Sequence, residues 1–159
     1  MNIDFFQNLK DKTVVVGGDH HARQTVEVIT SHLATLGMKF EVVPYDEDTK
    51  DYITQSLEVA QKVSKTPDKF CGVVGCKNGF GVTTVCNKYK NVFATRCDTP
   101  EQALDARRVN YCNVLTFGAV FVDKEEIKRI VDNWLTTDFE LNDKNAQRLQ
   151  RLFALQAEC

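Results

Sequence analysis

Short apolar runs recur along the chain, with polar or glycine-containing segments between them. The first run, Thr13–Gly17, has the sequence TVVVG, and its β-branched residues are continuous rather than alternating with polar ones. Such a run is typical of a strand that is covered on both faces of a sheet. Similar runs predict four more strands, at Met38–Pro44, Phe70–Val74, Val92–Arg96 and Val114–Phe117.

Apolar residues at helical spacing separate these strands. The clearest helix follows Asp123, which can cap it, and its apolar residues fall at i, i+3, i+4, i+7 and i+8. Thr99, with Pro100 after it, predicts the start of another helix. The apolar residues of the helix after Asp123 are Ile127, Ile130, Val131, Trp134 and Leu135. Three further helices are predicted from the same spacing. Their apolar residues are Val26, Ile29, Leu33 and Leu36, before a stop at Gly37; Ile53, Leu57, Ala60 and Val63; and Leu149, Leu152 and Phe153, within Asp143–Ala157.

Strands that alternate with helices, without hairpin signals, predict a parallel sheet with helices on both faces. The expected fold class is α/β, a Rossmann-like three-layer α/β/α sandwich around a five-stranded parallel sheet. We expect one domain over residues 1–159, with residues 1–12 as an N-terminal extension and residues 140–159 as a helical tail that docks on a partner subunit. Ligands of such sheets bind outside the carboxyl ends of the strands.

Composition narrows the class of protein. The chain has 159 residues, 43% hydrophobic and 26% charged, with a formal net charge of -2, which does not suggest a nucleic-acid partner. Met1 is not followed by a signal peptide, and no apolar run is long enough to span a bilayer, so we expect a cytoplasmic protein that does not bind membranes. The six cysteines contain no CxxC pair and the three histidines complete no structural zinc pattern. We therefore expect reduced thiols and no metal.

The main candidate site is the segment FCGVVGCKNGFGVTTVCNK, residues 70–88. Gly75, Gly79 and Gly81 allow close approach of the backbone to a ligand, and a helix is expected to follow, whose first amides have no intrahelical partner and suit an anion. A cysteine in front of a helix start is favoured as the thiolate, which makes Cys76 a candidate base or nucleophile. The alternative is that the glycines only form a tight turn and that Cys76 packs as a small apolar residue.

Polar residues near other element ends are secondary candidates. Asp19 and His20 follow the first strand without a GxGxxG fingerprint, so a nicotinamide cofactor is not expected. They could contact sugar hydroxyls or a phosphate, or Asp19 could cap a helix beside solvated histidines. Asn110 could be an ordinary turn former. Lys144 and Arg148, one helical turn apart, could clamp an anion together or face solvent.

Three other polar residues are assigned no role in chemistry. His21 and His32 are expected at the surface. Arg96 lies at the end of a predicted strand but has no motif partner.

Four segments together resemble a known family. They are VVGGDHHA at the first strand, GCKNGFGVTTVCNK after the third, NYCNVLTFGA at the fifth and IVDNWLTTDFE in the last long helix, in order over about Thr13–Glu140. They resemble the ribose-5-phosphate isomerase B family, which includes galactose-6-phosphate isomerase. The resemblance implies an aldose–ketose isomerase that acts on phosphorylated sugars without a metal or other cofactor.

The resemblance also implies roles for individual residues. Cys76 would take the proton next to the carbonyl, and Asp19 with His20 would contact the substrate. Asn110 matches an asparagine that binds the sugar. Family sites are built across a subunit interface, so the resemblance implies a homodimer, or a homo- or heterotetramer. The loop amides around Asn78–Gly81 would hold the enediolate oxygen. The substrate-binding loop as a whole consists of Lys77, Asn78, Gly79, Phe80 and Gly81. Lys144 and Arg148 are at best the counterparts of the family's paired tail arginines.

Two departures from the family decide which member is expected. Val109 stands where the family has its ring-opening histidine, and Val120 stands where an arginine is common. The leading hypothesis is a subunit like the B subunit of galactose-6-phosphate isomerase, which also lacks that histidine and obtains the missing groups from an A subunit. The alternatives are a self-sufficient ribose-5-phosphate isomerase B, in which Asp19 or His20 opens the ring, and a non-catalytic sugar-phosphate-binding partner subunit.

Overall fold

A computed structural model describes residues 8–158 as one parallel sheet with helices on both faces, which confirms the expected α/β sandwich. The five strands lie in the order β2-β1-β3-β5-β4. They are β1 (Thr13–Gly18), β2 (Phe40–Val42), β3 (Phe70–Cys76), β4 (Ala94–Arg96) and β5 (Val114–Gly118). The helices are η2 (Leu9–Asp11, a 3-10 helix), α1 (Arg23–Thr35), α2 (Tyr52–Lys65), α3 (Phe80–Cys86), α4 (Pro100–Asn110), α5 (Lys124–Thr136) and α6 (Asp143–Glu158).

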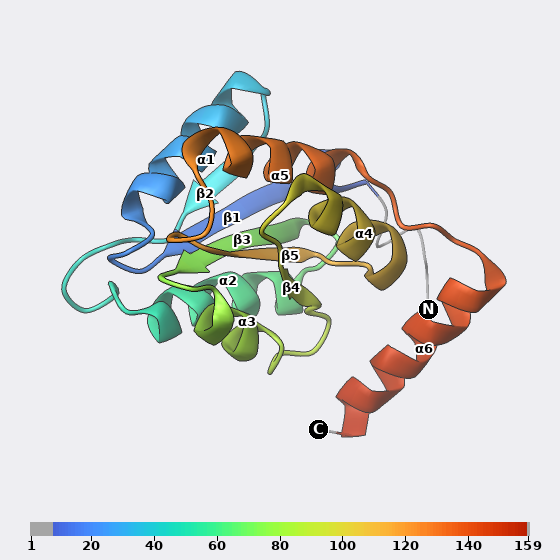
Figure 1. Ribbon diagram of the computed structural model, residues 1–159. Coiled ribbons are helices and arrows are strands. Elements are labelled where there is room, and N and C mark those ends of the chain that lie inside the picture. Colours follow the sequence, from blue (N-terminus) through green and yellow to red (C-terminus); the bar gives the residue numbers. More distant parts are fainter. Residues whose placement is uncertain (1–7, 159) are drawn as a thin grey trace.

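The sheet separates two apolar cores. Helices α1, α4 and α5 cover one face, and α2 and α3 cover the other (Figure 1). Successive residues of β1 contribute to opposite cores, because side chains alternate across a strand: Val14 and Val16 pack beneath α1 and α5, while Val15 packs against α2. All three are at most 1% exposed, which explains why the sequence of β1 is a continuous apolar run.

Local signals located two helix starts and one helix end correctly. Asp123 caps α5 by accepting hydrogen bonds from the amides of Glu125 and Glu126, and all five predicted apolar residues of that helix are buried. Thr99 caps α4 by accepting from the amide of Gln102, with a proline in the first turn. Gly37, just after α1, has φ of +69°, the left-handed conformation expected of a glycine stop.

Other boundaries and faces differ from the prediction. The second strand is limited to Phe40–Val42 at the edge of the sheet, and the fourth is limited to Ala94–Arg96, although Lys39 and Val43 still share backbone hydrogen bonds with β1. In α2 the buried face is rotated toward Gln55, so that Ile53 is 46% exposed.

Gln55 explains the rotation of α2. Its side chain is fully buried, and its Oε1 accepts a hydrogen bond from the Gly18 amide at 2.9 Å. Its Nε2 donates to the carbonyl oxygens of Pro44 at 2.7 Å and of Thr49 at 2.6 Å. Three hydrogen bonds satisfy the buried amide and fasten the β2–α2 loop to the end of β1.

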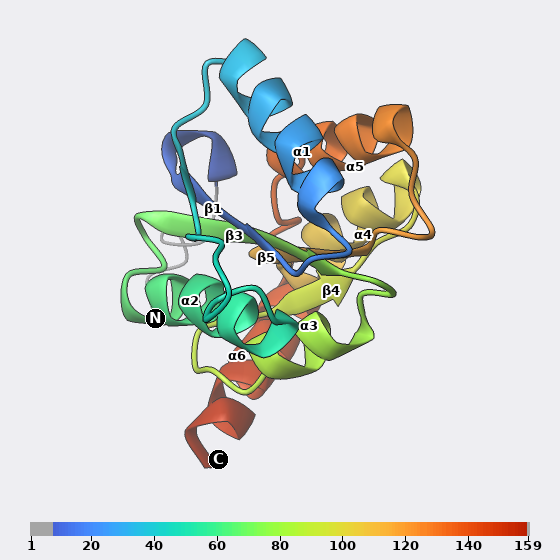
Figure 2. The same cartoon turned by 90° about the vertical axis from the view of Figure 1, so that its left-hand side faces the viewer.

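The two ends of the chain also contact the main body. Leu9, within the predicted N-terminal extension, is 1% exposed and belongs to the core beneath α5; the first seven residues lie outside the described part. In α6, Leu149 is buried and Phe153 packs edge-on against Phe93 with ring centroids 5.1 Å apart. Both ribbon views show α6 extending beyond the sandwich (Figures 1 and 2). Docking of this tail on a partner subunit stays a prediction.

Five cysteines of the described chain are free thiols, as the sequence predicts. Residue 159 lies outside the described residues. Among residues 8–158, no helix is both long and apolar enough to cross a membrane.

Buried thiols make stability depend on alkaline pH. Desolvation raises the pKa of Cys71 and of Cys86 from 9.0 to about 12, and it also raises the pKa of Cys97 and of Cys112. Between about pH 9 and 12 the folded chain therefore holds protons that the unfolded chain has lost, so the free energy of unfolding falls as pH rises. Desolvation lowers the pKa of Lys12 to about 8, which acts in the opposite sense between about pH 8 and 10.5.

We expect the free energy of unfolding to fall by on the order of 3 kcal/mol between pH 9 and pH 10. Urea unfolding at pH 8, 9 and 10, with a reductant present, measures this. Cys71→Ala should make the fall smaller by on the order of 1 kcal/mol, because one raised pKa is removed. Equal stability at pH 9 and pH 10 would contradict the prediction.

Candidate active site

The carboxyl ends of β1 and β3 meet at one edge of the sheet. The two strands are parallel neighbours, with Gly18 beside Gly75. The Asp19 amide, just after β1, donates to the Gly75 carbonyl oxygen at 3.2 Å, so Asp19 lies beside the strand that ends in Cys76. This confirms the expectation that the residues after the first and third strands share an edge.

Cys76 is the last residue of β3, and its own loop folds over the sulfur. Sγ accepts a hydrogen bond from the Gly79 amide at 3.2 Å, and it lies 3.9 Å from Oδ1 of Asn78. The residue is 5% exposed and borders the core beneath α2 and α3. The sulfur is therefore nearly covered, and polar groups of the glycine loop lie against it. The hydrogen bond from the Gly79 amide also fixes the position of the sulfur at this edge.

The loop amides are partly engaged within the loop itself. The Gly79 amide donates to Cys76, and the Phe80 amide donates to Oδ1 of Asn78 at 3.2 Å. The sequence predicts that amides around residues 78–81 point outward toward an anion. The structure corrects this for two of them, because the sulfur and the asparagine side chain occupy the positions that an oxyanion would take. Helix α3, which follows, is only seven residues long.

Glycines hold this loop against the end of β5. Gly79 has φ of +81°, and a Cβ there would lie 2.9 Å from the carbonyl carbon of Phe117. A Cβ on Gly118 would lie 2.6 Å from the carbonyl carbon of Asn78. The amides of Ala119 and Val120 donate to the carbonyl oxygens of residues 76 and 77 at 2.9 and 3.1 Å, which ties the loop to the segment after β5.

The Asp19 carboxylate is buried while the neighbouring imidazoles are exposed. Oδ1 accepts hydrogen bonds from the amides of His21 at 2.9 Å and Ala22 at 3.2 Å, and Oδ2 lies 3.6 Å from Nδ1 of His21. The rings of His20 and His21 have centroids 3.9 Å apart. The N-cap of helix α1 is Ala22 and not Asp19, so the alternative in which Asp19 caps this helix is wrong in that detail. Asp19 instead orders the turn that precedes the helix.

Arg96 also lies at this edge, although sequence reasoning gave it no role. Its guanidinium carbon stands 4.5 Å from the ring centre of Phe80 and 4.7 Å from that of Phe121, and its Nε and Nη2 donate to Asp98. Its Cδ would lie 3.0 Å from a Cβ on Gly79. The Arg96 side chain therefore packs on the glycine loop. The one feature of the sequence that could have indicated this was the position of Arg96 at the end of a predicted strand.

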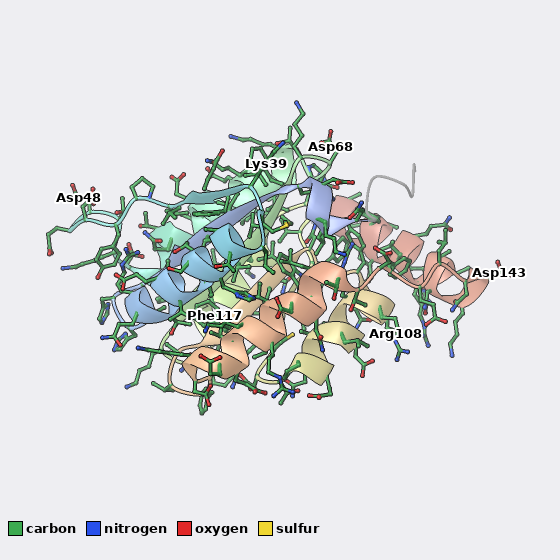
Figure 3. All side chains as sticks on the ribbon, turned by 90° about the horizontal axis from the view of Figure 1, so that it is seen from above. Lys39, Asp48, Asp68, Arg108, Phe117 and Asp143 are labelled. Atoms are coloured by element: carbon green, nitrogen blue, oxygen red, sulfur yellow. The ribbon has the colours of Figure 1, made fainter. Side chains whose placement is uncertain are left out.

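Three other predicted site residues lie at the opposite edge. Asn110 ends α4 and is exposed, four residues before the start of β5, whereas Cys76 pairs with Gly118 at the end of that strand. Lys144 and Arg148 are exposed on α6, which packs beside α4. Figure 3 labels Asp143, the first residue of α6, and Asp48, in the loop after β2, at opposite ends of the molecule. One chain thus brings Asp19, His20 and the glycine loop together, but not these three residues.

Comparisons with known proteins agree on one family. A family model described as Ribose/Galactose Isomerase matches residues 14–152. A probable ribose-5-phosphate isomerase B of Mycoplasma genitalium is 31% identical over 149 residues, which are 91% of this chain and 96% of that protein. The galactose-6-phosphate isomerase subunit LacA of Streptococcus agalactiae is 27% identical over 128 residues, which are 80% of this chain and 89% of that subunit.

Two further similarities concern length and fold. The DNA damage-repair/toleration protein DRT102 of Arabidopsis thaliana is 30% identical over 128 residues, 80% of this chain, but the chain spans only 40% of that protein. The crystal structure of ribose-5-phosphate isomerase B from Mycoplasma genitalium with bound ribulose-5-phosphate superposes with a TM-score of 0.86. It is 29% identical, and the match covers 92% of this chain and 97% of that one.

Proposed function

Because this chain belongs to the Ribose/Galactose Isomerase family and is a sugar-phosphate isomerase, we propose that it interconverts an aldose and a ketose phosphate with Cys76 as the base. The observation that carries the proposal is the position of the Cys76 sulfur. It lies at the carboxyl edge of the sheet, 3.2 Å from the Gly79 amide nitrogen and one strand away from the buried Asp19.

The reaction follows from that position. The Cys76 thiolate removes the proton from the carbon next to the substrate carbonyl, which leaves an enediolate, and the thiol returns the proton to the former carbonyl carbon. The hydroxyl proton moves from the second oxygen to the first, so that the carbonyl group shifts by one carbon. Preorganised donors must stabilise the charge that develops on the oxygen. The amides of Gly79 and Phe80 are suited to this role, but their present acceptors are Sγ and the Asn78 side chain. Substrate binding would therefore transfer one or both of these hydrogen bonds to the substrate oxygen.

The sugar that we propose first is ribose 5-phosphate. Alignment to the Mycoplasma genitalium ribose-5-phosphate isomerase B reaches nearly end to end in both proteins, whereas the match to the galactose-6-phosphate isomerase subunit is shorter and less similar. This favours the self-sufficient isomerase over the hypothesis of a B-type subunit. The second candidate is the B-type subunit of a galactose-6-phosphate isomerase. It is still supported by Val109, since a valine cannot move the proton that opens the sugar ring. In the first candidate, Asp19 is the group that we propose for ring opening.

The complete site is proposed to form between two chains. Asn110 and the cations Lys144 and Arg148 lie at the amino edge of the sheet, and β5 separates that edge from Cys76 by about 13 Å. They cannot reach the sulfur of their own chain without unfolding α4 or α6. A second copy of this chain could bring these residues to the Cys76 edge. In the second candidate, an A-type subunit would supply the corresponding groups.

The decisive experiment is an isomerase assay of the purified chain on ribose, allose and galactose phosphates, with and without a galactose-6-phosphate isomerase A subunit. We expect the chain alone to turn over ribose 5-phosphate. Turnover of galactose 6-phosphate that appears only with the A subunit would support the second candidate instead. Sugar-phosphate binding without exchange of solvent protons under any condition would identify a non-catalytic subunit and contradict both.

A further inference from the structure

A second kind of site overlaps the edge where the sugar phosphate is proposed to bind. Asp19, His20 and His21 each present one ligand atom, and these three atoms lie within 4.8 Å of one another. We propose that the three side chains bind a divalent transition-metal ion of the zinc class, and that the bound ion inhibits the isomerase. The binding part stands on these residues alone, whereas the inhibition part rests on the proposed function.

The carboxylate is prepared for such an ion by its backbone contacts. Two amides donate to Oδ1 of Asp19, which fixes the plane of the carboxylate and leaves Oδ2 facing His21. The side chain of Asp19 is only 7% exposed, so it has little freedom to move away. A fixed anionic oxygen beside two imidazoles loses little conformational entropy when it coordinates a metal.

The two imidazoles can adjust to complete the set. Their centroids are 3.9 Å apart, so both rings lie on the same side of the turn, and both residues are exposed. Zinc–nitrogen bonds measure about 2.0–2.1 Å and zinc–carboxylate bonds about 2.0–2.2 Å, so the ligand atoms of a tetrahedral site lie about 3.3–3.5 Å apart. Ligand atoms that now lie within 4.8 Å of one another must therefore close in by up to about 1.5 Å. Rotation of exposed histidine side chains supplies that movement without a change in the backbone.

The ligand set selects the kind of ion. Two imidazoles and one carboxylate suit zinc, cobalt, nickel or copper, whereas magnesium and calcium prefer oxygen ligands. Three protein ligands leave a fourth position for water. His32 offers a comparison within the same chain, because its Nε2 lies 2.7 Å from Oδ1 of Asp132 and it is not part of this group.

Inhibition follows from shared residues. Asp19 and His20 are the pair proposed to contact the sugar phosphate, so an ion held by both would withdraw them from the substrate. Zinc should therefore raise KM for the sugar phosphate, and a chelator should restore it. His21 is outside the proposed catalytic group, so replacing it should remove the metal effect and leave the metal-free reaction in place.

Cobalt binding tests the site without any use of activity. Untagged wild-type chain is titrated with Co²⁺ and followed by visible absorption and calorimetry, beside His21→Gln and the matched control His32→Gln. We expect one ion per chain, a loss of affinity of at least about tenfold in His21→Gln, and no change in His32→Gln. A thiolate-to-cobalt charge-transfer band would contradict the assignment, since it would show that a cysteine holds the ion. So would equal affinities of all three proteins, or no binding up to about 1 mM.

Zinc inhibition of the wild type and of His21→Gln separates this inference from the proposed function. A rise in KM with zinc in the wild type but not in His21→Gln supports both. Normal turnover by a chain that binds no cobalt contradicts the metal site alone. Cobalt binding that depends on His21, in a chain that isomerises no sugar phosphate, contradicts the proposed function and leaves the metal site standing.

Discussion

Cys76→Ser is expected to lower kcat for sugar-phosphate isomerisation by about 10²–10⁴-fold, the usual loss when a general base is removed. Serine keeps an acceptor for the Gly79 amide, which now donates to the sulfur at 3.2 Å, so the glycine loop should hold its shape. Alanine would leave that amide without its acceptor, at a cost of about 1–3 kcal/mol in stability. Serine therefore separates the chemistry from the loop geometry.

Two measurements check this prediction, turnover and the exchange of solvent deuterium into the substrate. The matched control is Cys71→Ala, on the same strand but in the core on the opposite face of the sheet. Burial raises the pKa of that thiol to about 12, so it stays protonated at neutral pH and should not contribute to catalysis. If Cys76→Ser retained wild-type exchange while Cys71→Ala lost it, the base would be wrongly assigned.

Gly118→Ala is expected to disturb both stability and activity. The new Cβ would lie 2.6 Å from the carbonyl carbon and 2.7 Å from the carbonyl oxygen of Asn78, and backbone atoms cannot rotate aside. We expect a loss of about 1–3 kcal/mol in the free energy of unfolding from overpacking. Because the loop that must move carries the Cys76 environment, kcat should fall by about 10²-fold. Urea unfolding and the isomerase assay measure the two effects.

Gly37→Ala is the control for the stability part of this prediction. Unlike Gly118, Gly37 has a positive φ, and a Cβ there would meet nothing within 4 Å; the residue lies just after α1, away from the candidate site. Alanine at this position should cost about 1–2 kcal/mol through backbone strain alone, with kcat unchanged. A comparable loss of kcat in both variants would mean that reduced stability, and not displacement of the loop, explains the effect of Gly118→Ala.

Several features of this protein were determined by the sequence by itself. The five buried residues of α5 were identified because helical periodicity is a local property, and Asp123 and Thr99 cap their helices through contacts no more than three residues away. The parallel sheet followed from the alternation of strands and helices. That alternation also predicted that Asp19 and Cys76 share an edge, because all strands of a parallel sheet end on the same side.

Other features were decided only by the tertiary structure. The buried Gln55 rotated α2 because it has three partners, one at the end of β1 and two in the loop before α2. A hydrophobicity pattern cannot show that a polar residue has its hydrogen bonds satisfied inside the core. A hydrophobicity pattern also could not show that Arg96 packs against aromatic rings, because those rings come from α3 and from the segment after β5. The motif residues Asn110, Lys144 and Arg148 were separated from Cys76 by the length of β5. Sequence spacing records neither distance nor direction between elements, and only the packed sheet determines which side chains can meet.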